Sequence, residues 1–333
     1  MKALVLLVVL AACSEGKKTE PKREPERQRR VIEPPTRGVR ALPPHAIRAD
    51  GVGPYKLGAT VTQLLDQLPS GPRIAQFSLP GVIQRDILRA EEDAILIGTE
   101  PQGKATFVSV VRADIARTEA GVHVGSTREQ LEESLGASID DPQRALDKRV
   151  VIPSKLENAR FVFDGDRIVA IVIAAEPERS KEPAGPPRDP EETDKLIATI
   201  KLPGLVFAAP LRNPSDGRDD IVTITRTDEA QSRTWTLAAY RMHEGKLAKS
   251  IEPQVVYELT AANARWIGAD IRDLDLYLEL SSRADSIEVG GLLTTRVGEK
   301  IRDIVVIQPY SVGRKRAKPV PHETSDAGTS DAR

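Results

Sequence analysis

The sequence predicts an α+β protein. Tandem small helix-plus-antiparallel-sheet units precede a mostly β domain, with a disordered tether before them and a disordered tail after them. Three observations predict this fold class: an internal repeat that aligns residues 55–68 with 122–135, apolar strand-like runs after each copy, and a proline-rich break at 176–193.

The N-terminus has the composition of a signal peptide. Lys2 precedes an apolar run over residues 3–12, which is about half of the ~20 residues that a membrane-spanning helix needs. The run therefore predicts the apolar core of a signal peptide and not an anchor helix. It ends in Leu10-Ala11-Ala12-Cys13.

This ending resembles the lipobox of bacterial lipoproteins, in which an apolar residue and two small residues precede the cysteine that receives diacylglycerol. The resemblance implies cleavage between Ala12 and Cys13, a covalent lipid on Cys13, and, with Ser14 next, sorting to the outer membrane. Several acyl chains would anchor the protein durably, since each buried CH₂ contributes about 0.8 kcal/mol. The alternative is an ordinary signal peptide that happens to contain a cysteine.

Three segments are rich in proline and charge and poor in large apolar residues: the tether at 13–48, the linker at 176–193 and the tail at 313–333. Such segments cannot bury enough apolar surface to offset the entropy of ordering them, so we expect them to be disordered. They delimit two folded parts, 49–175 and 194–312. Basic clusters in the tether and tail could contact anionic lipid headgroups or serve only solubility.

Each copy of the repeat predicts a short helix. The threonine is placed as an N-cap, the glutamine three positions later completes a capping box, and the glycine lets the chain turn from a strand into the helix. Leu64 and Leu68, like Leu131 and Leu135, share one helical face. The capping residues are Gly58, Thr60 and Gln63 in the first copy and Gly125, Thr127 and Gln130 in the second.

Strand signals follow each helix, at 94–98 and 106–111 in the first copy and at 160–163 and 167–174 in the second. Asp164-Gly165 between the last two runs predicts a hairpin. This helix-then-meander pattern resembles the domains of BamE-type (small protein A) outer-membrane assembly lipoproteins, which open with a Gly-x-Ser/Thr-x-x-x-Leu-x-x-x-Leu-Gly helix. The resemblance covers about 15 residues per copy and implies a domain type.

The second part alternates like a β protein, with nine candidate strands that begin at 196–201 and end at 301–308. Two aspartate-rich turns enter strands at 218–225 and 273–280. They resemble FG-GAP repeats, whose loops bind calcium, and this resemblance implies Asp216, Asp219 and Asp220 as calcium candidates. The alternative is a turn whose Asp and Gly residues fit its backbone, because Arg212 and Pro214 stand where the family places oxygen ligands.

The sequence carries no motif of a known catalytic site, so we expect no enzyme and no cofactor. It contains four histidines and lacks the zinc-protease, nucleophile-elbow, phosphate-loop and dinucleotide-binding patterns. His123 is expected to be structural or solvated, and Trp235 and Trp266 to lie in the core. A paired-carboxylate hydrolase stays open, since carboxylates are plentiful.

The 48 basic and 49 acidic residues give a net charge of −1, which argues against a protein that binds nucleic acid through bulk positive charge. The expectation is a non-enzymatic lipoprotein of the bacterial outer membrane that faces the periplasm and presents its domains to an envelope protein partner. The alternative is a module in the β-rich part that binds calcium or a small molecule.

The lipobox predicts that Cys13→Ala leaves an unlipidated precursor or releases soluble protein, because the acceptor of the lipid is lost. Membrane fractionation of cells that express each form measures this. A Cys13→Ala protein that stays in the membrane fraction like the wild type would contradict the lipoprotein hypothesis.

Overall fold

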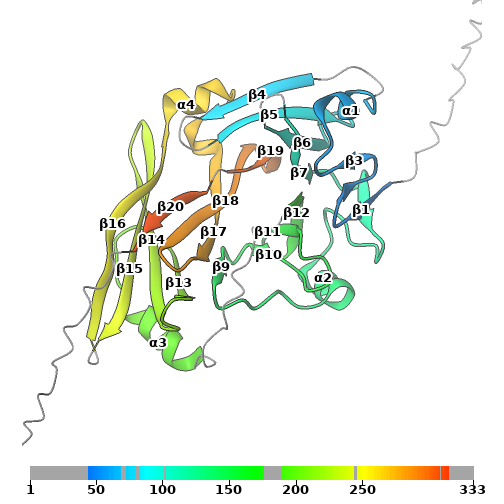
Figure 1. Ribbon diagram of the computed structural model, residues 1–333. Coiled ribbons are helices and arrows are strands. Elements are labelled where there is room, and N and C mark those ends of the chain that lie inside the picture. The colour runs from blue at the N-terminus through cyan, green and yellow to red at the C-terminus, as the bar shows by residue number, and fades with distance from the viewer. Residues whose placement is uncertain are drawn as a thin grey trace, which may run out of the picture. The chain divides into compact units, whose positions relative to one another are not determined.

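The computed structural model describes residues 44–68, 73–79, 83–100, 103–175, 190–243, 246–307 and 309–314. Among these, 55% lie in strands and 12% in helices, so the protein is mostly β and the predicted α+β class is wrong. Cys13 and Ala12, most of the tether and linker, and the tail beyond 314 lie outside the described residues. We call 44–175 the N-terminal half and 190–314 the C-terminal half (Figure 1).

The N-terminal half forms two sheets. One is small, with strand order β3-β2-β1-β8, and the other has seven strands in the order β10-β11-β12-β7-β6-β5-β4. The elements are β1 (His45–Arg48), β2 (Gly51–Val52), β3 (Tyr55–Lys56), α1 (Val61–Leu65), β4 (Arg73–Leu79), β5 (Ile83–Ala90), β6 (Ile95–Thr99), β7 (Ala105–Val110), β8 (Ala116–Thr118), α2 (Arg128–Leu135), β9 (Arg144–Leu146), β10 (Val150–Val151), β11 (Ala159–Asp164) and β12 (Arg167–Ala174).

The C-terminal half also forms two sheets. One has the order β13-β14-β15-β16; the other has the order β19-β18-β17-β9, with β20 also paired to β18. Its elements are α3 (Pro190–Thr199), β13 (Leu205–Arg212), β14 (Asp219–Asp228), β15 (Ser232–His243), β16 (Lys246–Thr260), α4 (Ala261–Trp266), the 3₁₀ helix η1 (Ile271–Asp273), β17 (Leu274–Ser282), β18 (Ser286–Val297), β19 (Lys300–Val306) and β20 (Tyr310–Gly313).

In both copies of the internal repeat, a backbone hydrogen bond joins the glycine before the helix to a strand of the same copy. The Gly58 N–H donates to the Ala105 carbonyl at 2.8 Å, and the Gly125 N–H donates to the Ile168 carbonyl at 2.7 Å. Each contact joins the turn before a short helix to the last strand of its own copy. These last strands, β7 and β12, pair with one another at the middle of the seven-stranded sheet, so the two copies build one sheet.

Both predicted capping boxes are formed. Thr60 and Thr127 accept hydrogen bonds from the N–H groups of Gln63 and Gln130, whose side chains accept from the threonine N–H groups in return. The glycine before each cap has a positive φ, +76° at Gly58 and +101° at Gly125, a conformation that disfavours other residues. The repeat therefore specifies how each helix starts.

The two helices of the repeat are short, and strands make up most of each copy. The fold is therefore mostly β and not the predicted α+β class. α1 has five residues and buries Leu64, and α2 has eight residues. The seven-stranded sheet is instead covered on both faces. In β6, Ile95 and Ile97 belong to the core under the helices, while Leu96 belongs to the core shared with the C-terminal half. An unbroken apolar run is typical of a strand buried on both faces.

Some boundaries also differ from the predictions. The fold begins earlier, because β1 lies within the predicted tether and pairs in parallel with β8. The predicted strand at 196–201 belongs largely to α3, which starts at Pro190, a residue favoured in the first turn of a helix. At the other end, β20 extends to Gly313, the first residue of the predicted tail.

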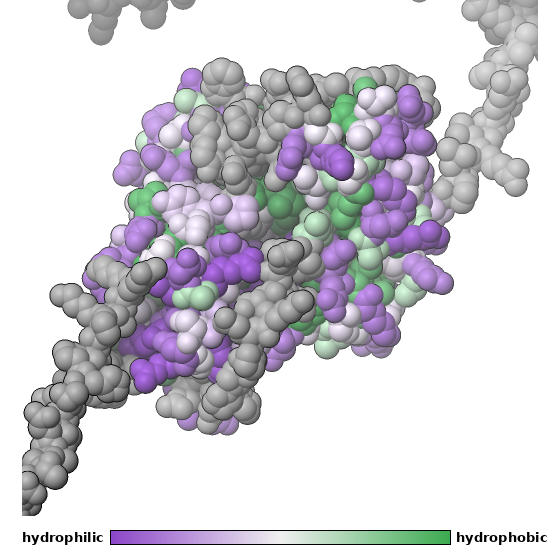
Figure 2. Space-filling model, in the orientation of Figure 1, coloured by the Kyte–Doolittle hydropathy of each residue, from purple (hydrophilic) through white to green (hydrophobic). Residues whose placement is uncertain are grey.

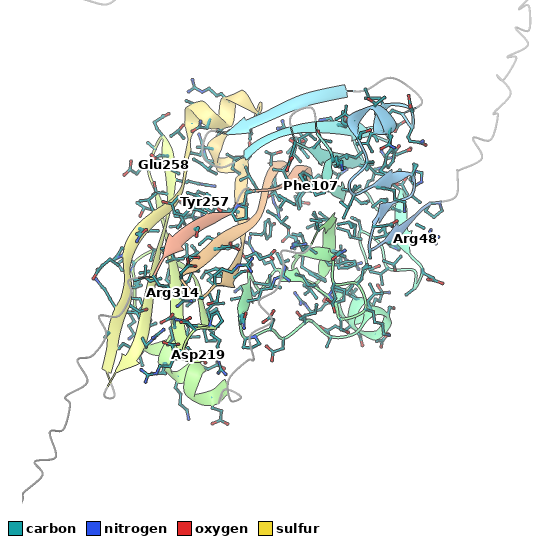
Figure 3. The ribbon with its side chains drawn as sticks, in the orientation of Figure 1. Arg48, Phe107, Asp219, Tyr257, Glu258 and Arg314 are labelled. Carbon is teal, nitrogen blue, oxygen red and sulfur yellow. The ribbon has the colours of Figure 1, made fainter. Side chains whose placement is uncertain are left out.

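The two halves share a strand pairing and a core. β9 of the N-terminal half pairs with β17 of the C-terminal half, and one cluster of buried apolar residues draws on both halves. Phe107, which belongs to this cluster, lies beside β18 and β19 in the middle of the view (Figure 3).

Ion pairs also join the halves, and we call them together the seam. The carboxylate of Glu279 on β17 accepts from Arg144 and Arg160, with 2.9 Å between Arg160 Nε and Glu279 Oε2. Asp303 on β19 is 2% exposed and accepts from Arg89 of β5. The five pairs of the seam are Arg89–Asp303, Arg144–Glu279, Arg149–Asp275, Arg160–Glu279 and Arg296–Asp164.

Glu279 is held in its charged form. Burial alone would raise the pKa of its carboxyl, but the charges of Arg160 and Arg144 lower that pKa to about 2. A glutamate in an unfolded chain has a pKa near ~4.3. The folded pKa is the lower of the two, so the pairing stabilises the fold above pH ~4.3, and this contribution is lost as the pH falls from there through 2.

Glu279→Gln should lower the free energy of unfolding by about 3 to 5 kcal/mol, because it leaves two buried guanidinium groups without their carboxylate. Urea unfolding followed by circular dichroism measures this. The matched control is Glu252→Gln, since Glu252 is 55% exposed and pairs with the exposed Lys249; it should change stability by under about 1 kcal/mol. Equal effects of the two substitutions would contradict a structural role for the seam.

Candidate functional site: an arginine-rich cleft

A cleft of about 640 Å³ lies where the loop from β9 to β10 meets β13 and β17. Strongly hydrophilic residues gather on the visible face over the lower left of the molecule, where β13 and β14 lie (Figure 2). We call the cleft the arginine cleft. It is lined by Leu146, Asp147, Lys148, Arg149, Val206, Phe207, Ala208, Ala209, Arg226, Arg233, Trp235, Arg272, Asp273, Leu274, Asp275, Leu276, Leu278 and Arg296.

Buried apolar side chains form part of the lining. Trp235 of β15 is 2% exposed and Phe207 of β13 is 8% exposed. Leu274, Leu276 and Leu278 are also buried, and they share one face of β17 because alternate residues of a strand point the same way. Apolar parts of a ligand could displace water from this surface at about 25 cal/mol per Å² of area covered.

Arg149 is fixed at the mouth of the cleft by three groups. Its guanidinium binds both carboxylate oxygens of Asp147, at 3.0 and 2.8 Å, and lies 2.6 Å from Asp275. It also lies over the ring of Tyr277, with 4.1 Å from Cζ to the ring centroid. Burial alone would lower the pKa of Arg149, but the two aspartates raise it above its ordinary value, so the group stays charged.

Two other arginines share one carboxylate. Asp228 lies 3.0 Å from Arg226 Nε and 3.6 Å from Arg233 Nε, and Arg233 also donates to the Leu274 carbonyl at 2.6 Å. Since one carboxylate faces two guanidinium groups, positive charge is left in excess on this wall.

The remaining basic groups of the lining differ in how fully their charges are paired. Arg272 is 85% exposed and lies 3.4 Å from Asp270, while Lys148 is exposed. Arg296 contacts Asp164 at 2.8 Å and the Tyr277 hydroxyl at 3.2 Å. Among the described residues of the lining, six are basic and three are aspartates, and Asp164, Asp228 and Asp270 pair with lining arginines from outside the lining. The least neutralised charges, on Lys148, Arg272 and the two arginines that share Asp228, favour an anionic ligand that also has an apolar part.

Of the residues singled out from the sequence, Trp235 lines the cleft, and the capping residues lie elsewhere. The capping residues of the repeat are at the starts of α1 and α2 and do not line the cleft. Of the two tryptophans, Trp235 is in the core as expected. The side chain of Trp266 lies outside the described residues.

The three calcium candidates are engaged by arginines. Asp219 pairs with Arg212 at 2.9 Å, and Arg241 contacts Asp216 at 2.7 Å and Asp220 at 2.9 Å. Asp220, which is fully buried, also accepts from Arg314. Asp219 and Arg314 both lie on the C-terminal half (Figure 3). A cation would have to displace these guanidinium groups, so the geometry does not fit calcium, and in the described part of the chain no group of three or more His, Cys, Asp or Glu is placed to hold a metal.

Sequence reasoning missed the arginine cleft because its residues come from six separate segments. The local sequences Asp147-Lys148-Arg149 and Arg272-Asp273 look like ordinary solvated turns. The alternation of leucines with aspartates at 273–278 predicted a strand, but not that its edge would border a cleft.

The chain was compared with models of protein families, with curated proteins and with solved structures, and it matches none of them. None of the helices in the described segments has the length and apolar character that crossing a membrane requires.

Proposed function

We propose that this protein is a lipid-anchored, non-enzymatic binding protein of the bacterial outer membrane, facing the periplasm, whose arginine cleft binds an anionic ligand with an apolar part. The exposed charges of Lys148 and Arg272 and the two arginines that share Asp228, beside a buried apolar lining, support the ligand class. The lipobox ending at Cys13 supports the anchor.

A role in presenting domains to an envelope protein partner is compatible with this proposal. A partner protein could supply the anionic and apolar groups from one of its own segments. The mixed lining favours this kind of ligand over a simple inorganic anion, because a bare anion would gain nothing from Trp235 or Phe207.

Decyl phosphate should bind to the full mature chain, whereas decyl maltoside, which has the same apolar chain and no charge, should bind far more weakly. Isothermal titration calorimetry at low and moderate salt measures both, and binding of decyl phosphate should weaken as salt rises. The substitutions Lys148→Gln and Arg272→Gln together should weaken it about fivefold, since both groups are exposed in the cleft.

The matched control is the pair Arg48→Gln and Arg117→Gln, which changes the net charge equally at exposed positions that do not line the cleft. This control should leave the affinity within about twofold of the wild type. Equal binding of the charged and uncharged probes, or equal effects of the two double variants, would contradict the proposal.

A further inference from the structure

The arginine cleft borders the backbone of an edge strand. β13 stands at the end of its sheet and pairs only with β14 among the described strands. Four consecutive residues, 206–209, line the cleft. Because neighbouring side chains of a strand point to opposite faces, a face would contribute only every second residue. A consecutive run therefore indicates that the edge of β13, with its peptide groups, faces the cleft.

The hydrogen bonds of β13 identify which peptide group is available. The Arg212 N–H points away from β14, because it donates to the Pro142 carbonyl at 2.7 Å. Residues two apart in a strand direct their N–H and C=O groups to the same side. Pro210 has no N–H to offer on that side, and the register shift between Leu205 and Phe207 interrupts the alternation at Val206. Ala208 is therefore the position whose N–H and C=O both face the cleft.

The edge of β17 across the cleft is already covered by side chains. Arg233 donates to the Leu274 carbonyl at 2.6 Å, and the Asp275 carboxylate accepts from the Leu276 N–H at 2.9 Å. Farther along the same edge, Glu279–Ser281 of β17 pair with β9. An incoming strand would therefore pair with β13 and not with β17.

Charge and exposure indicate the side chains of such a strand. Val206 is 45% exposed beside the buried Phe207, and Arg226, Arg233 and Lys148 surround the same space. A strand presents alternate side chains to opposite sides. Acidic residues at one set of positions would meet the basic groups, and apolar residues at the other set would meet the apolar lining.

Building on the proposed function, we propose that the ligand is an extended acidic segment of a partner protein, which adds as a strand to the free edge of β13. Main-chain hydrogen bonds to Ala208 would give affinity, and the basic side chains would select acidic sequences, as in other cases of strand addition. Pro210 and the contact from Arg212 to Pro142 close one end, so the paired stretch is short.

The test uses fluorescence anisotropy with the full mature chain and a labelled decapeptide of alternating glutamate and valine. This peptide should bind, and a decapeptide of alternating lysine and valine should not. Methylating the backbone nitrogens of alternate residues in the glutamate–valine peptide should weaken binding about tenfold, because it removes main-chain donors and leaves the charges in place.

On the protein, Ala208→Pro should weaken the glutamate–valine peptide about fivefold, because it removes the N–H that faces the cleft. Ala208→Val keeps that N–H and is the matched control. Circular dichroism and the melting temperature of Ala208→Pro report whether that variant is folded.

Decyl phosphate binding without peptide binding, or peptide binding that tolerates N-methylation, would overturn strand addition and leave the proposed function standing. If the wild-type protein binds neither decyl phosphate nor the peptide, the proposed function itself is overturned. The N-methylation result uses the wild-type chain, so it decides the matter even if the proline variant does not fold.

Discussion

The structure depends on the pairing of two buried carboxylates, Glu279 and Asp303, with arginines from the other half of the chain. Apolar burial supplies most of the attraction between the halves, but it is non-directional. A buried ion pair contributes little net stability, whereas a buried charge without its partner is costly. We infer that these pairs fix the alignment of the halves, since another alignment would take Arg144 and Arg160 from Glu279 and would leave Asp303 with Arg302 of its own strand.

The arginine cleft follows from that alignment. Arg149 comes from the N-terminal half, Asp275 and Tyr277 from β17, and Phe207 from β13. No one of these segments contains the site. The seam brings the β9–β10 loop against β17, where the Asp147 N–H donates to the Leu278 carbonyl at 2.8 Å. A ligand held there would bridge the two halves.

Local features of the fold could be predicted from the sequence, and long-range ones could not. Thr60, Gln63, Thr127 and Gln130 specify the helix starts because a capping box is a contact between near neighbours. The fold class was wrong because α1 and α2 are short and because the apolar run at 167–174 was interpreted as a strand of a separate unit. Its lack of alternation indicated burial on both faces, but not that β17 to β19 would supply the second layer.

The candidate site was missed for the same reason. Asp216, Asp219 and Asp220 stood out because their loop resembles an FG-GAP loop, yet each meets an arginine, and Arg241 and Arg314 are distant in sequence. The cleft arginines follow no spacing rule, since Arg149, Arg226 and Arg296 converge only when the sheets pack. Sequence alone shows which residues carry charge, and the tertiary structure determines which charges are neutralised.

The most direct test of the account is to cut the chain between its halves. A recognition site for a sequence-specific protease can replace residues 181–186, and gel filtration of the cut protein then measures association. The two fragments should elute together at the position of the intact protein, because the seam and the shared core hold them. Elution as two separate species would contradict the account.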